Sequence, residues 1–75
     1  MESIAKKKRL RILGGQIRLM REERKWTQRD LEAYSGVSQS NIAQIEGGQR
    51  DPSASTLMML SDAFEEDFLI MHEKQ

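Results

Sequence analysis

Residues 39–44, with the sequence QSNIAQ, carry side chains that could recognise the edges of DNA bases. A glutamine amide holds a hydrogen-bond donor and an acceptor side by side, and this pair matches N7 and N6 of adenine in the major groove. Serine can donate or accept there, and an alanine methyl fits an apolar contact. The alternative is an ordinary solvated helix face, but such a face usually carries lysine and glutamate, whereas this one is uncharged as far as Glu46. The residues expected to contact bases are Gln39, Ser40, Ala43 and Gln44.

A short helix is predicted to lead into this stretch. Thr27 is a suitable N-cap because its hydroxyl can accept from the free N–H groups of the first turn, and Asp30 occupies the capping-box position. Gly36 should end the helix, because glycine takes the left-handed conformation wanted there without a Cβ penalty.

The same pattern repeats at once and predicts a second helix. Ser38 is its N-cap, and the pair Gly47-Gly48 ends it. Ile42 and Ile45 lie three residues apart, so one side of the helix is apolar and must pack inward, which leaves the amide-rich side facing out. Two helices separated by about three residues cross steeply, which is the helix-turn-helix arrangement.

The motifs of this region occur together in one order. They are Thr27-Gln28, Gly36-Val37-Ser38 in the turn, Ile42 to Glu46, and Pro52-Ser53 before a further helix. In this order and spacing, the chain resembles the Cro/CI-type (XRE-like) helix-turn-helix family of phage repressors and bacterial transcriptional regulators, over roughly residues 13 to 70. The resemblance implies an all-α, compact, five-helix repressor-like domain whose helices 2 and 3 form the helix-turn-helix. One departure is Glu32, where the family usually has a small residue.

The resemblance also implies roles for polar residues outside the base-reading face. In the family, an arginine of the first helix commonly pairs with the glutamate that ends the recognition helix, and the matching residues are Arg21 and Glu46. The alternative is that these are unrelated surface charges. Gln28 matches a glutamine that can bond the one at Gln39 while it holds a phosphate. Together with the loop after the recognition helix, the residues expected to contact the DNA backbone are Gln28, Arg21, Asn41, Gln49 and Arg50.

Charge is distributed unevenly along a chain whose net charge is zero. Residues 6–29 hold ten of the twelve basic side chains and only two acidic ones, whereas residues 30–75 hold nine acidic and two basic. Such asymmetry is common in small helical proteins and has no meaning by itself. Beside the helix-turn-helix motif, it indicates that the charge facing phosphates comes from the first third of the chain.

Two segments are expected before the helix-turn-helix. Residues 1–12 contain a basic cluster and form either an arm that contacts the duplex or an extra helical turn that contacts a second subunit. Gly14-Gly15 should break the helical propensity, so that helix 1 runs from there to about Arg24. The DNA-binding domain is therefore expected over residues 13–75.

The last third of the chain is predicted to hold two further helices. Ser53 caps the first, and Asp67 can cap a short second one. A chain of 75 residues has little interior, so part of its most apolar cluster is expected at a homodimer interface. That cluster consists of Phe64, Phe68, Leu69, Ile70 and Met71.

The sequence offers no catalytic constellation. His72 is the single histidine and would be alone as a metal ligand, there is no cysteine, and there is no glycine-rich phosphate loop. We therefore expect no enzyme activity, no cofactor and no metal. The chain has no long apolar run, so no membrane contact is expected, and its absence of cysteine suits a reducing cytoplasm. The family resemblance implies a bacterial or phage-encoded protein associated with the nucleoid.

Two functional hypotheses follow from these patterns. The first is a transcriptional repressor that binds double-stranded DNA as a homodimer on a two-fold symmetric operator, with the helix over residues 38–46 in the major groove. The second is a protein-binding adaptor, such as the antitoxin of a toxin–antitoxin pair. The uncharged amide face favours the first, because an adaptor has no need of base-reading side chains.

Overall fold

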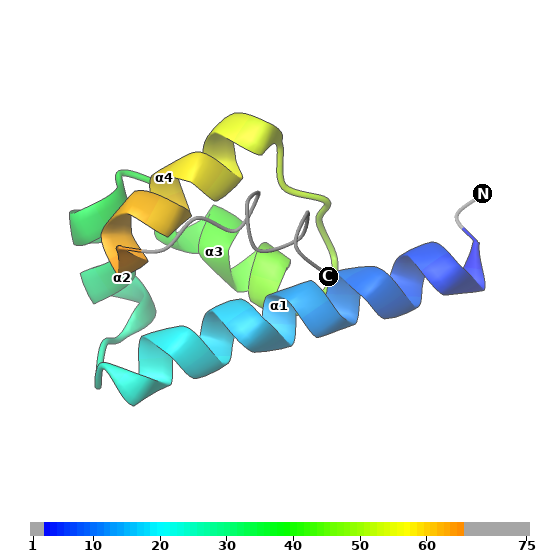
Figure 1. Ribbon diagram of the computed structural model, residues 1–75, viewed down its shortest axis with the longest axis horizontal. Coiled ribbons are helices and arrows are strands. Elements are labelled where there is room, and N and C mark those ends of the chain that lie inside the picture. The colour runs from blue at the N-terminus through cyan, green and yellow to red at the C-terminus, as the bar shows by residue number, and fades with distance from the viewer. Residues whose placement is uncertain (1–2, 66–75) are drawn as a thin grey trace.

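A computed structural model describes residues 3–65 of the chain (Figure 1). They form four helices, α1 (Ile4–Glu23), α2 (Gln28–Ser35), α3 (Gln39–Glu46) and α4 (Ala54–Phe64), and no strand. The all-α prediction is confirmed. The count of five helices is not supported: the described residues form four, and the short helix expected after Asp67 lies outside them.

The helix boundaries around the turn agree with the capping pattern of the sequence. The Thr27 hydroxyl accepts from the Asp30 N–H at 3.0 Å, and the Asp30 carboxylate accepts from the Thr27 N–H at 2.8 Å, which completes a capping box. Gly36 ends α2 with a φ of +82°, and Ser38 caps α3 by accepting from the Asn41 N–H at 3.2 Å. These local bonds fix the turn that separates the two helices.

Helix α1 is longer than the sequence predicts, because it begins at Ile4 and passes without a break through Gly14-Gly15. The expected helix break at this pair was wrong. A Cβ at Gly14 would clash with the carbonyl oxygens of Ile45 and Glu46, so glycine is needed there for close packing of α1 on the end of α3. Tertiary packing therefore overrides the low helix propensity of the pair.

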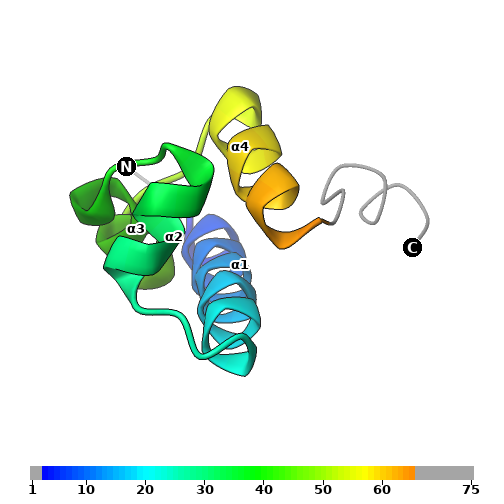
Figure 2. The same cartoon turned by 90° about the vertical axis from the view of Figure 1, so that its left-hand side faces the viewer.

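The core lies where all four helices meet. In Figure 2, α1 is seen nearly end-on with α2 and α3 on one side and α4 on the other. Phe64 is only 1% exposed and stacks on Trp26 with ring centroids 5.8 Å apart. Phe64 therefore belongs to the core of its own chain, and the rest of the apolar cluster in which the sequence places it, Phe68 to Met71, lies outside the described residues. The other fully buried side chains are Ile17, Leu31, Ile42, Ile45 and Leu60.

The two adjacent glycines of α1 should respond to alanine in opposite directions. Gly15 has open space around its Cα, so Gly15→Ala should raise the free energy of unfolding by about 0.5 to 1 kcal/mol through better helix propensity. Gly14→Ala should lower it by about 1 to 3 kcal/mol, because the new methyl would push α1 away from α3. Urea unfolding of both variants measures the difference, and equal effects would contradict this packing.

Candidate nucleic-acid interface

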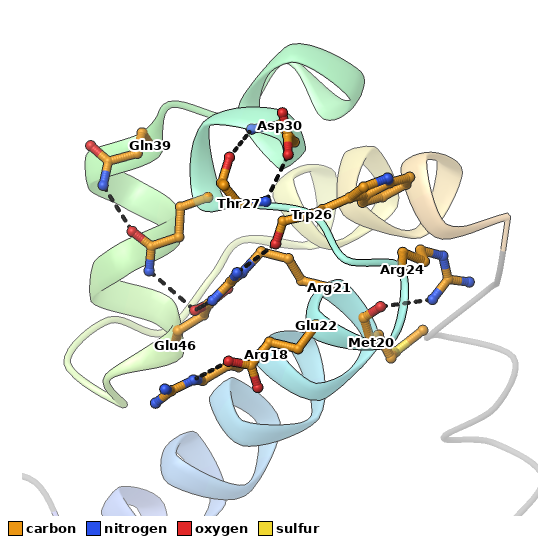
Figure 3. Close-up of polar contacts among 11 residues, drawn as sticks. Arg18, Met20, Arg21, Glu22, Arg24, Trp26, Thr27, Asp30, Gln39 and Glu46 are labelled. Carbon is orange, nitrogen blue, oxygen red and sulfur yellow. Dashed lines mark hydrogen bonds and ion pairs between the residues drawn. The ribbon is translucent and has the colours of Figure 1, made fainter.

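An ion pair joins Arg21 of α1 to Glu46 at the end of α3 (Figure 3). Arg21 donates through Nε and Nη2 to the two carboxylate oxygens of Glu46, at 2.8 and 2.9 Å. Its Nη1 donates to the Trp26 carbonyl at 2.7 Å. The two charged side chains are only 11% and 5% exposed. Arg21 and Glu46, which the family resemblance predicts to be paired, are thus joined in the bidentate geometry that makes such hydrogen bonds strong.

The surroundings of Arg21 keep it charged. Hydrogen bonding to the Glu46 carboxylate raises the pKa of Arg21 above its ordinary value, while burial acts in the opposite direction and the charges of Glu46 and Glu22 raise it further. With most of the guanidinium enclosed and three of its nitrogens bonded, Arg21 has little surface left for a phosphate. Its geometry is that of a positioning residue for α3.

A chain of amide hydrogen bonds leads from this ion pair to the outer face of α3. The Gln28 amide donates through Nε2 to Glu46 Oε1 at 3.1 Å. The Gln39 amide in turn donates through Nε2 to Gln28 Oε1 at 2.8 Å. Figure 3 shows Gln39 near the start of α3 and Glu46 near its end.

The chemistry of these groups fixes which way each amide points. An ionised carboxylate only accepts, so Gln28 must present its NH₂ group to Glu46 and its oxygen to Gln39. Gln39 must then give an N–H to that oxygen. This leaves the Gln39 oxygen and its second N–H for a ligand, and a donor beside an acceptor is the pattern that matches adenine.

The other predicted base-contacting residues lie on the same helix with different exposure. Ser40 is exposed, whereas Ala43 and Gln44 are half-buried. Beyond the helix, Gln49 and Arg50 are both exposed, and the Gln49 backbone N–H donates to the Gln44 carbonyl at 2.8 Å. The loop that follows α3 is therefore bonded to the helix that carries Ser40, Ala43 and Gln44.

Asn41 differs from the other predicted backbone-contacting residues. Its side-chain oxygen is buried and has no hydrogen-bond partner among the described residues. Its half-buried position on α3 turns that oxygen away from solvent. Only its amide NH₂ is left to approach a phosphate.

Sequence reasoning missed two contacts that hold this site together. One is the bond from Gln28 to Glu46, which joins residues 18 apart in the sequence. The other is the close contact of Gly14 with the end of α3. The signal for the second was present, because a glycine inside an otherwise helical segment often marks a close approach of two backbones.

The described residues show neither a metal-ligating cluster nor a membrane-spanning helix. Among them, no group of three or more histidine, cysteine, aspartate or glutamate side chains could hold a metal ion. No helix in residues 3–65 has both the length and the apolar character needed to span a bilayer.

Removing either partner of the buried ion pair should be costly. Arg21→Ala and Glu46→Ala should each lower the free energy of unfolding by about 3 to 5 kcal/mol, because each leaves an uncompensated charge in a site with little solvent. The double substitution should cost less than the sum of the single ones, by about 0.5 to 3 kcal/mol. Denaturant unfolding in a double-mutant cycle measures this difference. Strictly additive effects would show that the two side chains do not interact.

Comparison with known proteins shows that the chain is similar to bacterial regulators of transcription. It is 47% identical over 51 residues to the HTH-type transcriptional repressor RghR of Bacillus subtilis. The matched segment covers 67% of this chain and 38% of that protein. It is 36% identical over 53 residues to the HTH-type transcriptional regulator y4dJ of Sinorhizobium fredii, covering 71% of this chain and 69% of that protein. It is 36% identical over 52 residues to the competence pilus inhibition repressor of Acinetobacter baylyi, covering 69% of this chain and 47% of that protein.

The chain thus spans less than half the length of two of these relatives. No solved structure matches it significantly.

The family and the names of these relatives point to transcription regulators, which are not enzymes, as the sequence predicts. The helix-turn-helix family matches residues 17–69, a segment that contains the Arg21–Glu46 pair, both glutamines and the whole of α2 and α3. The chain therefore belongs to the helix-turn-helix family of the XRE type.

Proposed function

We propose that the protein is a sequence-specific regulator of transcription, acting as a repressor, that places α3 in the major groove of double-stranded DNA. In this proposal Gln39, Ser40, Ala43 and Gln44 contact base edges. Gln28, Asn41, Gln49 and Arg50 contact the sugar-phosphate backbone, with Arg21 behind them. The family and the names of the relatives support DNA binding in a regulator. The setting that fits such a role is the cytoplasm of a bacterium, at its nucleoid.

The observation that carries the proposal is the orientation of the Gln39 amide. The bond to Gln28, at 2.8 Å, uses one N–H and leaves a donor and an acceptor free at the start of the recognition helix. A base-reading amide is more selective when its orientation is set before binding, because it then cannot rotate to suit the wrong base. We therefore assign adenine as the base read by Gln39.

In this proposal, some side chains read sequence and others only hold the duplex. Gln39 and Gln44 lie on α3, whereas Arg50 is an exposed charge in the loop after it. A charge opposite a phosphate adds affinity on every sequence, because the backbone carries no sequence information. Base-reading amides add affinity only where the right edge is present.

Substitutions should therefore divide into two classes. Gln39→Ala or Gln44→Ala should cost about 1 to 3 kcal/mol of binding free energy on the preferred duplex and far less on random DNA. Arg50→Ala should weaken binding to both alike and reduce the salt slope by about one unit per monomer. Gln16→Ala, which removes an exposed amide from α1, is the matched control. It should change neither the binding free energy nor the salt slope.

The measurement begins by selecting preferred duplexes from a random pool, then determines binding of each variant on preferred and random duplexes at several salt concentrations. Equal losses on both duplexes for the glutamine variants would show that α3 does not read bases. Failure of the wild-type chain to shift any duplex would contradict DNA binding and favour the alternative function, a protein-binding adaptor.

The proposal includes a symmetric homodimer. The described part of the chain measures 33 × 28 × 21 Å along its principal axes, so two copies side by side could place their recognition helices about 34 Å apart, one turn of B-DNA. The apolar residues expected at the interface, Phe68 to Met71, lie outside the described part of the chain.

Symmetry of this kind has a measurable consequence on DNA. Selected sites should contain two inverted half-sites about ten base pairs apart from centre to centre, and sedimentation at micromolar concentration should report a dimer. A monomer that protects only one half-site would contradict the proposal for the assembly while leaving the base-reading assignment intact.

A further inference from the structure

The amino-terminal half of α1 is strongly basic and is in contact with the rest of the domain. Residues 4–13 contain five basic side chains and no acidic one. Lys6 forms an ion pair with Asp51 at 3.8 Å, and the stem of Arg11 packs directly on Gly48. This half of α1 therefore lies beside the loop that follows α3, as Figure 1 shows, and is not a free arm.

Three exposed cations of α1 share one side of the helix, and we call them the basic stripe: Lys7, Arg11 and Arg18. At about 100° per residue, they lie within about 60° of Gly14 around the helix axis. Gly14 marks the direction of α3, because it packs against the carbonyls that end that helix. In Figure 3, Arg18 extends to the side of the molecule on which Glu46 and Gln39 lie. The basic stripe thus flanks the recognition helix.

We propose that the basic stripe binds the phosphate backbone of the same duplex that α3 reads, so that α1 extends the DNA contact beyond the two helices of the motif. This inference rests on the proposed function. Lys7 and Arg18 are eleven residues apart, which at about 1.5 Å per residue gives a row about 16 Å long. The duplex presents one negative charge per about 1.7 Å of its axis, so a row of this length meets several phosphates.

The energetics of α1 favour a polyanion at this place. Lys7 and Arg11 are like charges at positions i and i+4, and the first turn of the helix holds basic residues where the helix dipole favours acidic ones. Each of these features weakens the helix in isolation. Arg18 forms an ion pair with Glu22 at 3.3 Å, in an exposed position where solvent makes such a pair weak and easily exchanged. Phosphates beside the stripe would relieve the repulsion.

Two double variants test the proposal because they remove the same charge from different sides of α1. The test variant is Lys7→Gln with Arg11→Gln. The control is Lys8→Gln with Arg9→Gln, whose exposed side chains lie about 120° and 140° around the helix from Gly14. Binding of both to a preferred duplex and a random duplex is measured over a range of salt concentrations. Ethylation interference on the preferred duplex maps the phosphates involved, and circular dichroism checks that both variants fold.

The test variant should lose affinity on both duplexes, its salt slope should fall by roughly two units per monomer, and it should lose phosphate contacts at the edge of the interference pattern. The control should keep the wild-type pattern and nearly the wild-type slope. Equal changes in the two variants, or no change in the test variant, would overturn this inference while leaving DNA reading by α3 in place. If the wild-type chain bound no duplex at all, both this inference and the proposed function would be overturned.

Discussion

The buried ion pair between Arg21 and Glu46 is the constraint on which the rest of the site depends. A charge pair with side chains 11% and 5% exposed is stable only if its geometry is good and its remaining hydrogen-bonding capacity is used. Both conditions hold here, since the guanidinium is bidentate and also bonds the Trp26 carbonyl, and the carboxylate also accepts from Gln28. The pair joins α1, the segment between α1 and α2, and the end of α3 at one point.

The orientation of the Gln39 side chain on α3 follows from that point. Because the Glu46 carboxylate can only accept, it sets the direction of the Gln28 amide, which sets the direction of the Gln39 amide. The buried Glu46 carboxylate at the end of α3 thereby determines which atoms of the Gln39 amide are free at the start of that helix. Gly14 makes this possible, because it lets the backbone of α1 come close enough to the end of α3 for Arg21 to reach the carboxylate.

Features that depend on neighbouring residues were predictable from the sequence. The capping box at Thr27, the left-handed Gly36 and the cap at Ser38 each need only a few residues to form, so α2 and α3 could be placed closely. The family resemblance supplied the Arg21–Glu46 pair, which joins residues 25 apart in the sequence.

Features that depend on distant packing were not predictable in this way. The continuation of α1 through Gly14-Gly15 is decided by its contact with α3, and local propensity points the other way. The burial of Phe64 is decided by Trp26 and Arg24, which come from the segment after α1. The link from Gln28 to Glu46 requires knowledge of how steeply α2 and α3 cross, which the spacing of residues does not give.

The central claim is that the ion pair, acting through Gln28, presents the Gln39 amide to a base. The most direct test is a crystal structure of the chain bound to a duplex selected for tight binding. The account predicts α3 in the major groove, with the Gln39 amide bonded at once to Gln28 and to the N6 and N7 edge of an adenine. A complex in which Gln39 leaves Gln28 to reach the base, or in which α3 lies outside the groove, would contradict it.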